Sequence, residues 1–398
     1  MPLLIDGTPH EDGVFTLELT PDAPHRLKTS PGQGSLTLGP RTLLKTADLW
    51  LPVDACVLWP CFDPFATPAG SPWPRSFYYT GNDSGFFTWA QLRPIENFSW
   101  HPQLRQDVHI DASQSQIREL SIHLQAGNQG HIHLKLPQQG MRLHLHGNLE
   151  QITVTAGLPE SLSLSPATSK NPAGEAFQLP DMGCLKQVTT LELSNGAGKQ
   201  PISLQSLLQF SKLESLSLWG NHSDLAQLSS CTQLKALSLR FMRHLSGLPA
   251  LPTWPELDFF IAYNVEEAAG KRLRQQLKDR AKARPWADYT SVSQLRKPEW
   301  WAKEYGRPFA GWPAARARIA HAAYELAEQE IGTASSLGHV QAALTTFAAR
   351  FNTVKGIETS EREDLGLAVQ QLAQLPAALA LKLTHEQAQQ WFDENRDY

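Results

Sequence analysis

The spacing of leucine in the middle of the chain is the feature that most constrains its fold. Leu213, Leu216 and Leu218 are followed by Asn221 in the pattern L-x-x-L-x-L-x-x-N. Related apolar positions recur at 188–193, 234–239 and 257–262, and the first anchors are 25, 21 and 23 residues apart. A repeat of this length predicts a stack of small supersecondary units.

Within each unit the alternation predicts a short strand whose leucines point inward while the residues between them point outward. One unit cannot bury its own leucines, whereas stacked neighbours can. Aligning the four units places the outward residues in two columns. These candidate partner-binding residues are Ser194, Trp219, Arg240 and Tyr263 in one column, and Glu192, Ser217, Ser238 and Ile261 in the other.

Tryptophan, arginine and tyrosine are the residue types that dominate protein-interface hot spots. Their succession in the first column predicts a continuous partner-binding patch. The alternative is that the helical C-terminal segment of the same chain covers this face, in which case these side chains are internal packing.

These repeats resemble bacterial leucine-rich repeats, and the segment 245–252, LSGLPALP, resembles the LPX type. Three departures predict irregular turns, since Asn195 and Asn264 stand one position early and Met242 replaces the third asparagine. Some bacterial LPX proteins carry a helical ubiquitin-ligase domain with a nucleophilic cysteine. The last cysteine here is Cys231, so the resemblance implies no ligase activity.

Upstream, L-x-L pairs recur about every ten residues through 117–166. An antiparallel meander of short strands fits this spacing. A solenoid with two sheets, in which alternate strands belong to alternate sheets, also fits. We favour the solenoid because its period continues into the repeats that follow.

The chain changes character along its length and predicts an α+β fold in three parts. We expect an aromatic β-rich domain at 1–112, a β-solenoid with leucine-rich repeats at 113–264, and a helical domain at 265–398. Helical spacing at 340–351 and 365–372 supports the last part. The first helix is predicted to have its N-cap at Asn264. A second helix is predicted to start near Pro313 and stop at Gly332, and capping boxes are predicted at Ser360/Glu363 and Thr384/Gln387. The Trp- and Pro-rich segment 297–312 is expected to fold against these helices.

The overall composition limits the classes of partner. The formal net charge is −4, with 35 basic and 39 acidic residues, which disfavours nucleic-acid binding. No apolar run reaches the ~18 residues of a membrane span, and the first residues lack the basic start of a signal peptide. The four cysteines form no CxxC pair, so a reduced, cytoplasmic protein is expected.

The search for reactive residues predicts no catalytic centre, metal or cofactor. GxSxG, Walker A and HExxH motifs are absent from the sequence. Cys56 and Cys61 stand among apolar residues, which predicts buried and inert thiols. Five histidines alternate with apolar residues, and a solvated polar ladder is favoured over a metal site: His123, His131, His133, His144 and His146.

A non-catalytic protein-binding function fits these observations. The combination of repeats and helices resembles immunity proteins of polymorphic toxin systems, which implies that the chain binds and neutralises a toxin domain. Two alternatives stay open: a secreted effector or adaptor whose repeats bind a host protein, and a metal-dependent enzyme that uses the N-terminal part or the histidines.

Overall fold

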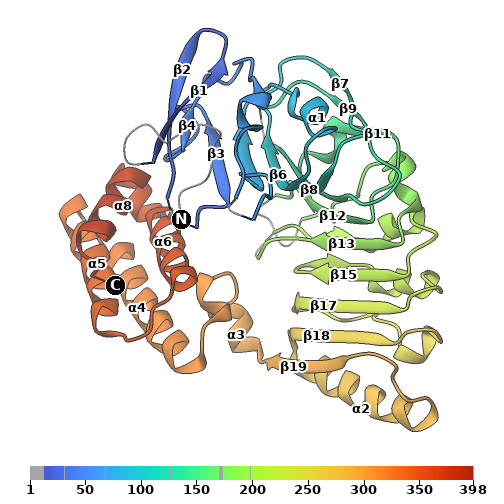
Figure 1. Cartoon of the computed structure of the whole chain (residues 1–398). Helices are drawn as coiled ribbons and strands as arrows, with labels where there is room; N and C mark the ends of the chain where they lie inside the picture. Colours follow the sequence, from blue (N-terminus) through green and yellow to red (C-terminus); the bar gives the residue numbers. More distant parts are fainter. Residues whose placement is uncertain are drawn as a thin grey trace. The chain divides into compact units, whose positions relative to one another are not determined.

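The computed structural model describes residues 13–397, except 31, 68, 126, 170–173 and 198. It is a mixed α/β protein with a large parallel sheet and a set of C-terminal helices (Figure 1). The chain forms two compact units that divide between Arg296 and Lys297, and each has its own hydrophobic core. Within the described residues, every helix is too short or too polar to cross a lipid bilayer.

A twelve-stranded sheet runs through the first unit, and every neighbouring pair in it is parallel. Parallel neighbours need a connection that returns the chain to the same end of the sheet. The strands, in order across the sheet, are β4 (Leu49–Trp50), β3 (Ser35–Gly39), β5 (Ser76–Thr80), β6 (Ile95–His101), β8 (Ile117–Leu124), β10 (Arg142–Gly147), β12 (Ser161–Pro166), β13 (Thr190–Ser194), β15 (Ser215–Trp219), β17 (Ala236–Met242), β18 (Phe259–Glu266) and β19 (Thr290–Arg296).

Smaller sheets account for the remaining strands of this unit. They are the parallel trio β7 (Val108–Asp111), β9 (Ile132–Lys135) and β11 (Ile152–Ala156), the parallel pair β14 (Ile202–Ser203) and β16 (His222–Ser223), and the antiparallel pair β1 (Val14–Thr20) and β2 (Ala23–Lys28). Strands in 117–166 therefore alternate between two parallel sheets. The antiparallel meander considered for this segment is wrong, because none of its pairings is antiparallel.

Leucine fills the inward positions of the large sheet, as the alternation predicted. Leu191, Leu216 and Leu237 pair in register, and each is at most 1% exposed. Full burial of one such side chain contributes ~1.5–3 kcal/mol. The return segments bury further leucines against them in short 3-10 helices: η3 (Gly183–Gln187), η4 (Leu204–Gln209), η5 (Leu225–Ser230) and η6 (Leu251–Thr253).

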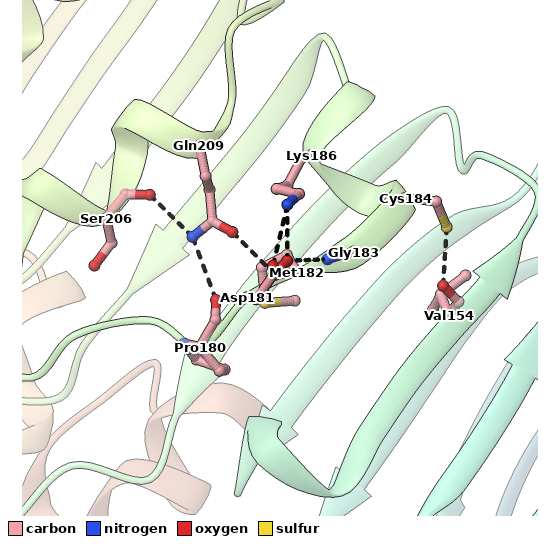
Figure 2. A network of polar contacts seen from close by, with 9 residues as sticks. All are labelled: Val154, Pro180, Asp181, Met182, Gly183, Cys184, Lys186, Ser206 and Gln209. Atoms are coloured by element: carbon pink, nitrogen blue, oxygen red, sulfur yellow. Dashed lines mark hydrogen bonds and ion pairs between the residues drawn. The ribbon is translucent and has the colours of Figure 1, made fainter.

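Polar side chains join successive returns to one another (Figure 2). The Gln209 side chain accepts a hydrogen bond from the Met182 backbone N at 2.9 Å and donates one to the Pro180 carbonyl at 3.3 Å. The Cys184 thiol donates to the Val154 carbonyl at 3.0 Å. These bonds link residues 27 to 30 positions apart, so each return is held in register with the one before it.

Aromatic residues replace leucine at the N-terminal end of the same sheet. Around Trp59 of η1 (Trp59–Phe62), the rings of Tyr79 and Phe98 lie at centroid distances of 5.3 and 5.6 Å. Phe86 of α1 (Phe86–Trp89) stacks on Phe98 at 3.8 Å. The change from aromatic to leucine packing occurs within one continuous core.

The two predicted domain boundaries both fall inside the large sheet. β6 pairs with β8 across 112/113, and β18 pairs with β19 across 264/265. The helix α2 (Glu267–Ala283) packs on β18 and β19 and belongs to the first unit. The second boundary is therefore displaced to 296/297.

The N-cap prediction at Asn264 is wrong. Asn264 lies in β18 with φ of 51° and is fully buried, and its side-chain oxygen accepts a hydrogen bond from Arg296 Nε at 2.6 Å. Glu266 caps α2 instead, accepting from the backbone N of Ala268 and Ala269.

The second unit is helical, as predicted. Its helices are α3 (Pro298–Lys303), α4 (Ala314–Gly332), α5 (Leu337–Ala349), α6 (Thr359–Ala373), α7 (Pro376–Ala380) and α8 (His385–Glu394), with η7 (Pro308–Gly311) and η8 (Arg350–Thr353) between them. The predicted limits at Pro313 and Gly332 are confirmed. In the segment 297–312, Phe309 and Trp312 join the helical core, as expected.

One of the two predicted capping boxes is correct. Thr384 and Gln387 form the box that begins α8. The box at Ser360 and Glu363 is wrong, because the capping box of α6 lies two residues earlier, with the Glu358 backbone N donating to Glu361 Oε2 at 3.0 Å.

Gly220 gives a test of how closely the strands approach at the end of β15. Its φ is 92°, and a Cβ placed there would lie 2.1 Å from the Asn195 carbonyl oxygen. We expect Gly220→Ala to lower the free energy of unfolding by at least ~1–3 kcal/mol, because the added carbon meets backbone in a strained conformation. Chemical denaturation of the full chain measures this.

Gly366 in α6 is the matched control. Nothing lies within 4 Å of a Cβ added there, so Gly366→Ala should stabilise the second unit by ~0.5–1 kcal/mol. Equal effects of the two substitutions would contradict the close approach at Gly220.

Candidate functional site

The two outward columns predicted from the repeats lie in register on the sheet. Ser194 pairs with Trp219, Trp219 with Arg240, and Arg240 with Tyr263. The second column is likewise continuous, and its members are Glu192, Ser217, Ser238 and Ile261. Adjacent strands stand ~4.8 Å apart, so the structure brings all eight residues together on one face.

Trp219 is the exposed large hydrophobic side chain of these columns, at 40%. The Arg240 guanidinium lies 5.9 Å from the Trp219 ring centroid, within the range of a cation–π contact. Arg240 Nε also donates to Ser238 Oγ at 3.2 Å, which ties the two columns together. Ser238 is 8% exposed, so it supports Arg240 more than it offers surface.

Phe241 is a member of this surface that the sequence reasoning missed. Its ring stacks on Trp219 with centroids 5.2 Å apart and planes within 9°, and it meets Tyr263 edge-on at 6.0 Å. We call Trp219, Arg240, Phe241 and Tyr263 the Trp219 cluster. Strict alternation along the strand assigns Phe241 to the core. The next residue, Met242, is also apolar, and only one of two neighbouring strand residues can point inward. That pair of apolar residues was the signal that Phe241 could lie on the outward face.

A column of left-handed residues explains how Phe241 reaches this face. Phe241, Asn264 and Gln294 have φ of 54°, 51° and 52° on three successive strands. After them the inward pairing resumes, with Met242 opposite Val265 and Val265 opposite Leu295. Each non-glycine residue in this region costs on the order of 1–3 kcal/mol, so the packing around it holds the conformation in place.

The first column continues beyond Ser194 into the histidines. The hydroxyls of Ser194 and Ser165 are hydrogen-bonded, and Ser165 pairs with His146. His146 stacks on His123 at a centroid distance of 4.3 Å, and His123 stacks on His101 at 4.0 Å, with planes within 5°. We call these three residues the His ladder. It shares one row of the sheet with the Trp219 cluster.

The His ladder is uncharged at neutral pH. Burial, followed by the neighbouring histidines, lowers the pKa of His123 to about 3. Burial is also the main cause that lowers the pKa of His101 and of His146. Within the described residues, no group of three or more His, Cys, Asp or Glu side chains is arranged to hold a metal ion.

The five histidines grouped in the sequence are divided between two sheets. His123, His144 and His146 lie on the large sheet, whereas His133 lies on β9, where it stacks on His109 of β7 at 4.4 Å. His131 precedes β9 and contacts Thr153 Oγ1 through Nε2 at 2.8 Å. The polar-face placement is confirmed for the four histidines that lie in strands, but the five do not form a single ladder, because they belong to two sheets.

The cysteines differ in part from the prediction. Cys61 is half-buried, and burial, with Asp63 as a smaller cause, raises the pKa of its thiol to about 12. Cys56 was expected to be buried and is exposed. All four cysteines are free thiols.

Three comparisons with known proteins, by family models, by sequence and by solved structures, found no match to this chain. The resemblance to leucine-rich repeats therefore rests on the residues of this chain alone.

The lowered pKa values of the His ladder predict acid-sensitive stability. The unfolded chain takes up protons as the pH falls through about 6.5, the ordinary histidine value. Folded His123 stays neutral until about pH 3. Unfolding therefore becomes easier as the pH falls through this window. Urea denaturation at pH 7 and at pH 4 should show this loss, and His123→Gln should reduce it.

The exposed His339 of α5 offers a control for this measurement. His339→Gln should leave the dependence of the urea midpoint on pH as in the wild type. If His123→Gln and wild type lose the same stability between pH 7 and pH 4, the ladder is not the acid-sensitive element.

Proposed function

We propose that the first unit is a leucine-rich-repeat solenoid whose outward face binds a protein partner, and that the chain acts as an immunity protein that neutralises a toxin domain. The observation that carries the proposal is the Trp219 cluster, because it places three aromatic rings and a guanidinium on consecutive strands of one face. No catalytic residue of this chain is needed, since a bound protein blocks a toxin by occupying its surface.

The physical properties of the cluster suit a hot spot. Stacking between Trp219 and Phe241, and the cation–π contact of Arg240, fix the orientation of these side chains before binding. A side chain that is already ordered loses less entropy when a partner covers it. Large aromatic and arginine side chains then supply contact area and hydrogen-bond donors.

The solenoid interpretation is supported by the parallel register and by the buried leucines of the returns. Units in register expose equivalent positions at a constant spacing, which gives an extended binding face. The immunity role is proposed because the combination of repeats and helices resembles immunity proteins of polymorphic toxin systems. A cytoplasmic location belongs to the same proposal, since four free thiols suit a reducing compartment.

The test is affinity purification of the tagged full chain from its native host, followed by binding measurements with the recovered partner. We expect a stoichiometric partner whose expression alone is toxic and whose toxicity is relieved by this chain. Trp219→Ala combined with Tyr263→Ala should weaken the complex by at least ~2 kcal/mol, which is roughly 30-fold in Kd.

Leu92 and Leu208 supply a matched control, since both are exposed apolar residues of the same unit, at 90% and 58%. Leu92→Ala combined with Leu208→Ala should leave the affinity unchanged. Unchanged affinity of a folded Trp219/Tyr263 double variant would refute the interface. A partner that is harmless when expressed alone would refute the immunity role.

A further inference from the structure

An open apolar groove lies between α4 and α5 of the second unit. Its volume is about 370 Å³, which falls within the ~300–1,000 Å³ of small-molecule sites. The stripe of α4 that lines it runs from Arg318 to Glu330. At ~1.5 Å per residue this stripe is ~18 Å long, so the groove is elongated along the helix axis.

The floor and wall of the groove are apolar. Ala327, Ala343 and Phe347 are each 2% exposed and belong to the helical core. Leu326 stands at the rim and is 48% exposed. The groove exists because the alanine side chains are too small to fill the space between the helices. An apolar occupant would remove the exposed surface of Leu326 from water, which favours binding.

The two ends of the groove differ in charge. Arg318 lies near the start of α4, and Arg350 directly follows α5. A four-residue connection joins these helices, so they run antiparallel and bring both arginines to the same end. Glu330, the acidic residue of the lining, lies toward the opposite end of the α4 stripe.

Neither arginine has an ion pair within the part of the chain that the structure describes. Other arginines of this unit are held by carboxylates: Arg307 by Glu325 and Glu328 at 3.2 Å, and Arg316 by Glu361 at 3.1 Å. Two unpaired guanidiniums at one end of an apolar groove are complementary to an anion that carries an apolar chain. Guanidinium binds carboxylate and phosphate oxygens through paired hydrogen bonds.

We propose that this groove binds an amphiphile with an anionic head and a single alkyl chain, of which a long-chain carboxylate is the simplest case. The head lies between Arg318 and Arg350, and the chain extends over Ala327 and Ala343 beside Leu326. The position of Glu330 fixes this orientation, since it repels an anionic head from the other end. This groove belongs to the second unit and the outward columns belong to the first, and the proposal does not depend on the partner proposed there.

The experiment is calorimetric titration of the full chain with dodecanoate below its micelle concentration, with dodecanol as the uncharged analogue. We expect dodecanoate to bind at one site and dodecanol to bind at least tenfold more weakly. Arg318→Gln and Arg350→Gln should each weaken dodecanoate about tenfold, and Leu326→Glu should abolish binding.

Matched controls come from α6 of the same unit. Arg362 and Leu367 are exposed, and neither lines the groove. Arg362→Gln and Leu367→Glu should bind dodecanoate like the wild type. Circular dichroism of every variant verifies that it is folded, so that loss of binding is read only from folded protein.

A second arm distinguishes a free carboxylate from a membrane lipid as the source of the anionic head. Sedimentation with phosphatidylglycerol vesicles but not with phosphatidylcholine vesicles, lost in Leu326→Glu and without binding of dodecanoate, would assign the groove to a two-chain membrane lipid and overturn the single-chain carboxylate. Equal binding of dodecanol and dodecanoate would overturn the proposal, as would arginine variants that bind normally. Failure of both probes, or a dimer of this chain that Leu326→Glu disperses, would overturn it as well.

Discussion

The parallel register of the large sheet is the constraint on which the first unit depends. Each inward leucine lies beside an inward apolar residue of the next strand, as Leu216 does between Leu191 and Leu237. A slip of one residue between two strands would exchange the inward and outward faces of everything beyond it. The same register therefore determines both the leucine core and the composition of the outward columns.

Much of this arrangement is predictable because it follows from two periods, alternation within a strand and a repeat of about 20–25 residues between strands. Those periods place Trp219, Arg240 and Tyr263 correctly. They fail at Phe241 and Asn264, where a positive φ interrupts the alternation. Asparagine adopts this conformation more often than most residues, which gives a weak signal at Asn264, but phenylalanine gives none, and the surrounding packing imposes it on Phe241.

The histidines show a different limit. Their outward orientation is predictable from alternation alone, but the stacking of His101, His123 and His146 depends on which strands are neighbours. The sequence groups His133 with His146 because they are near in the chain, whereas the sheet separates them. The boundary at 264/265 fails for a related reason: α2 has a helical composition, yet its packing on β18 and β19 makes it part of the sheet unit.

The shared row of the His ladder and the Trp219 cluster also defines a length. From His101 on β6 to Trp219 on β15 there are five steps between neighbouring strands, which amounts to ~24 Å along the sheet at ~4.8 Å per step. A short peptide lying across one or two strands reaches only one end of this row. A partner that contacts both ends must span this distance, as a folded domain or an extended segment of about eight residues does. The distance between the two sets of side chains is therefore a criterion of partner size.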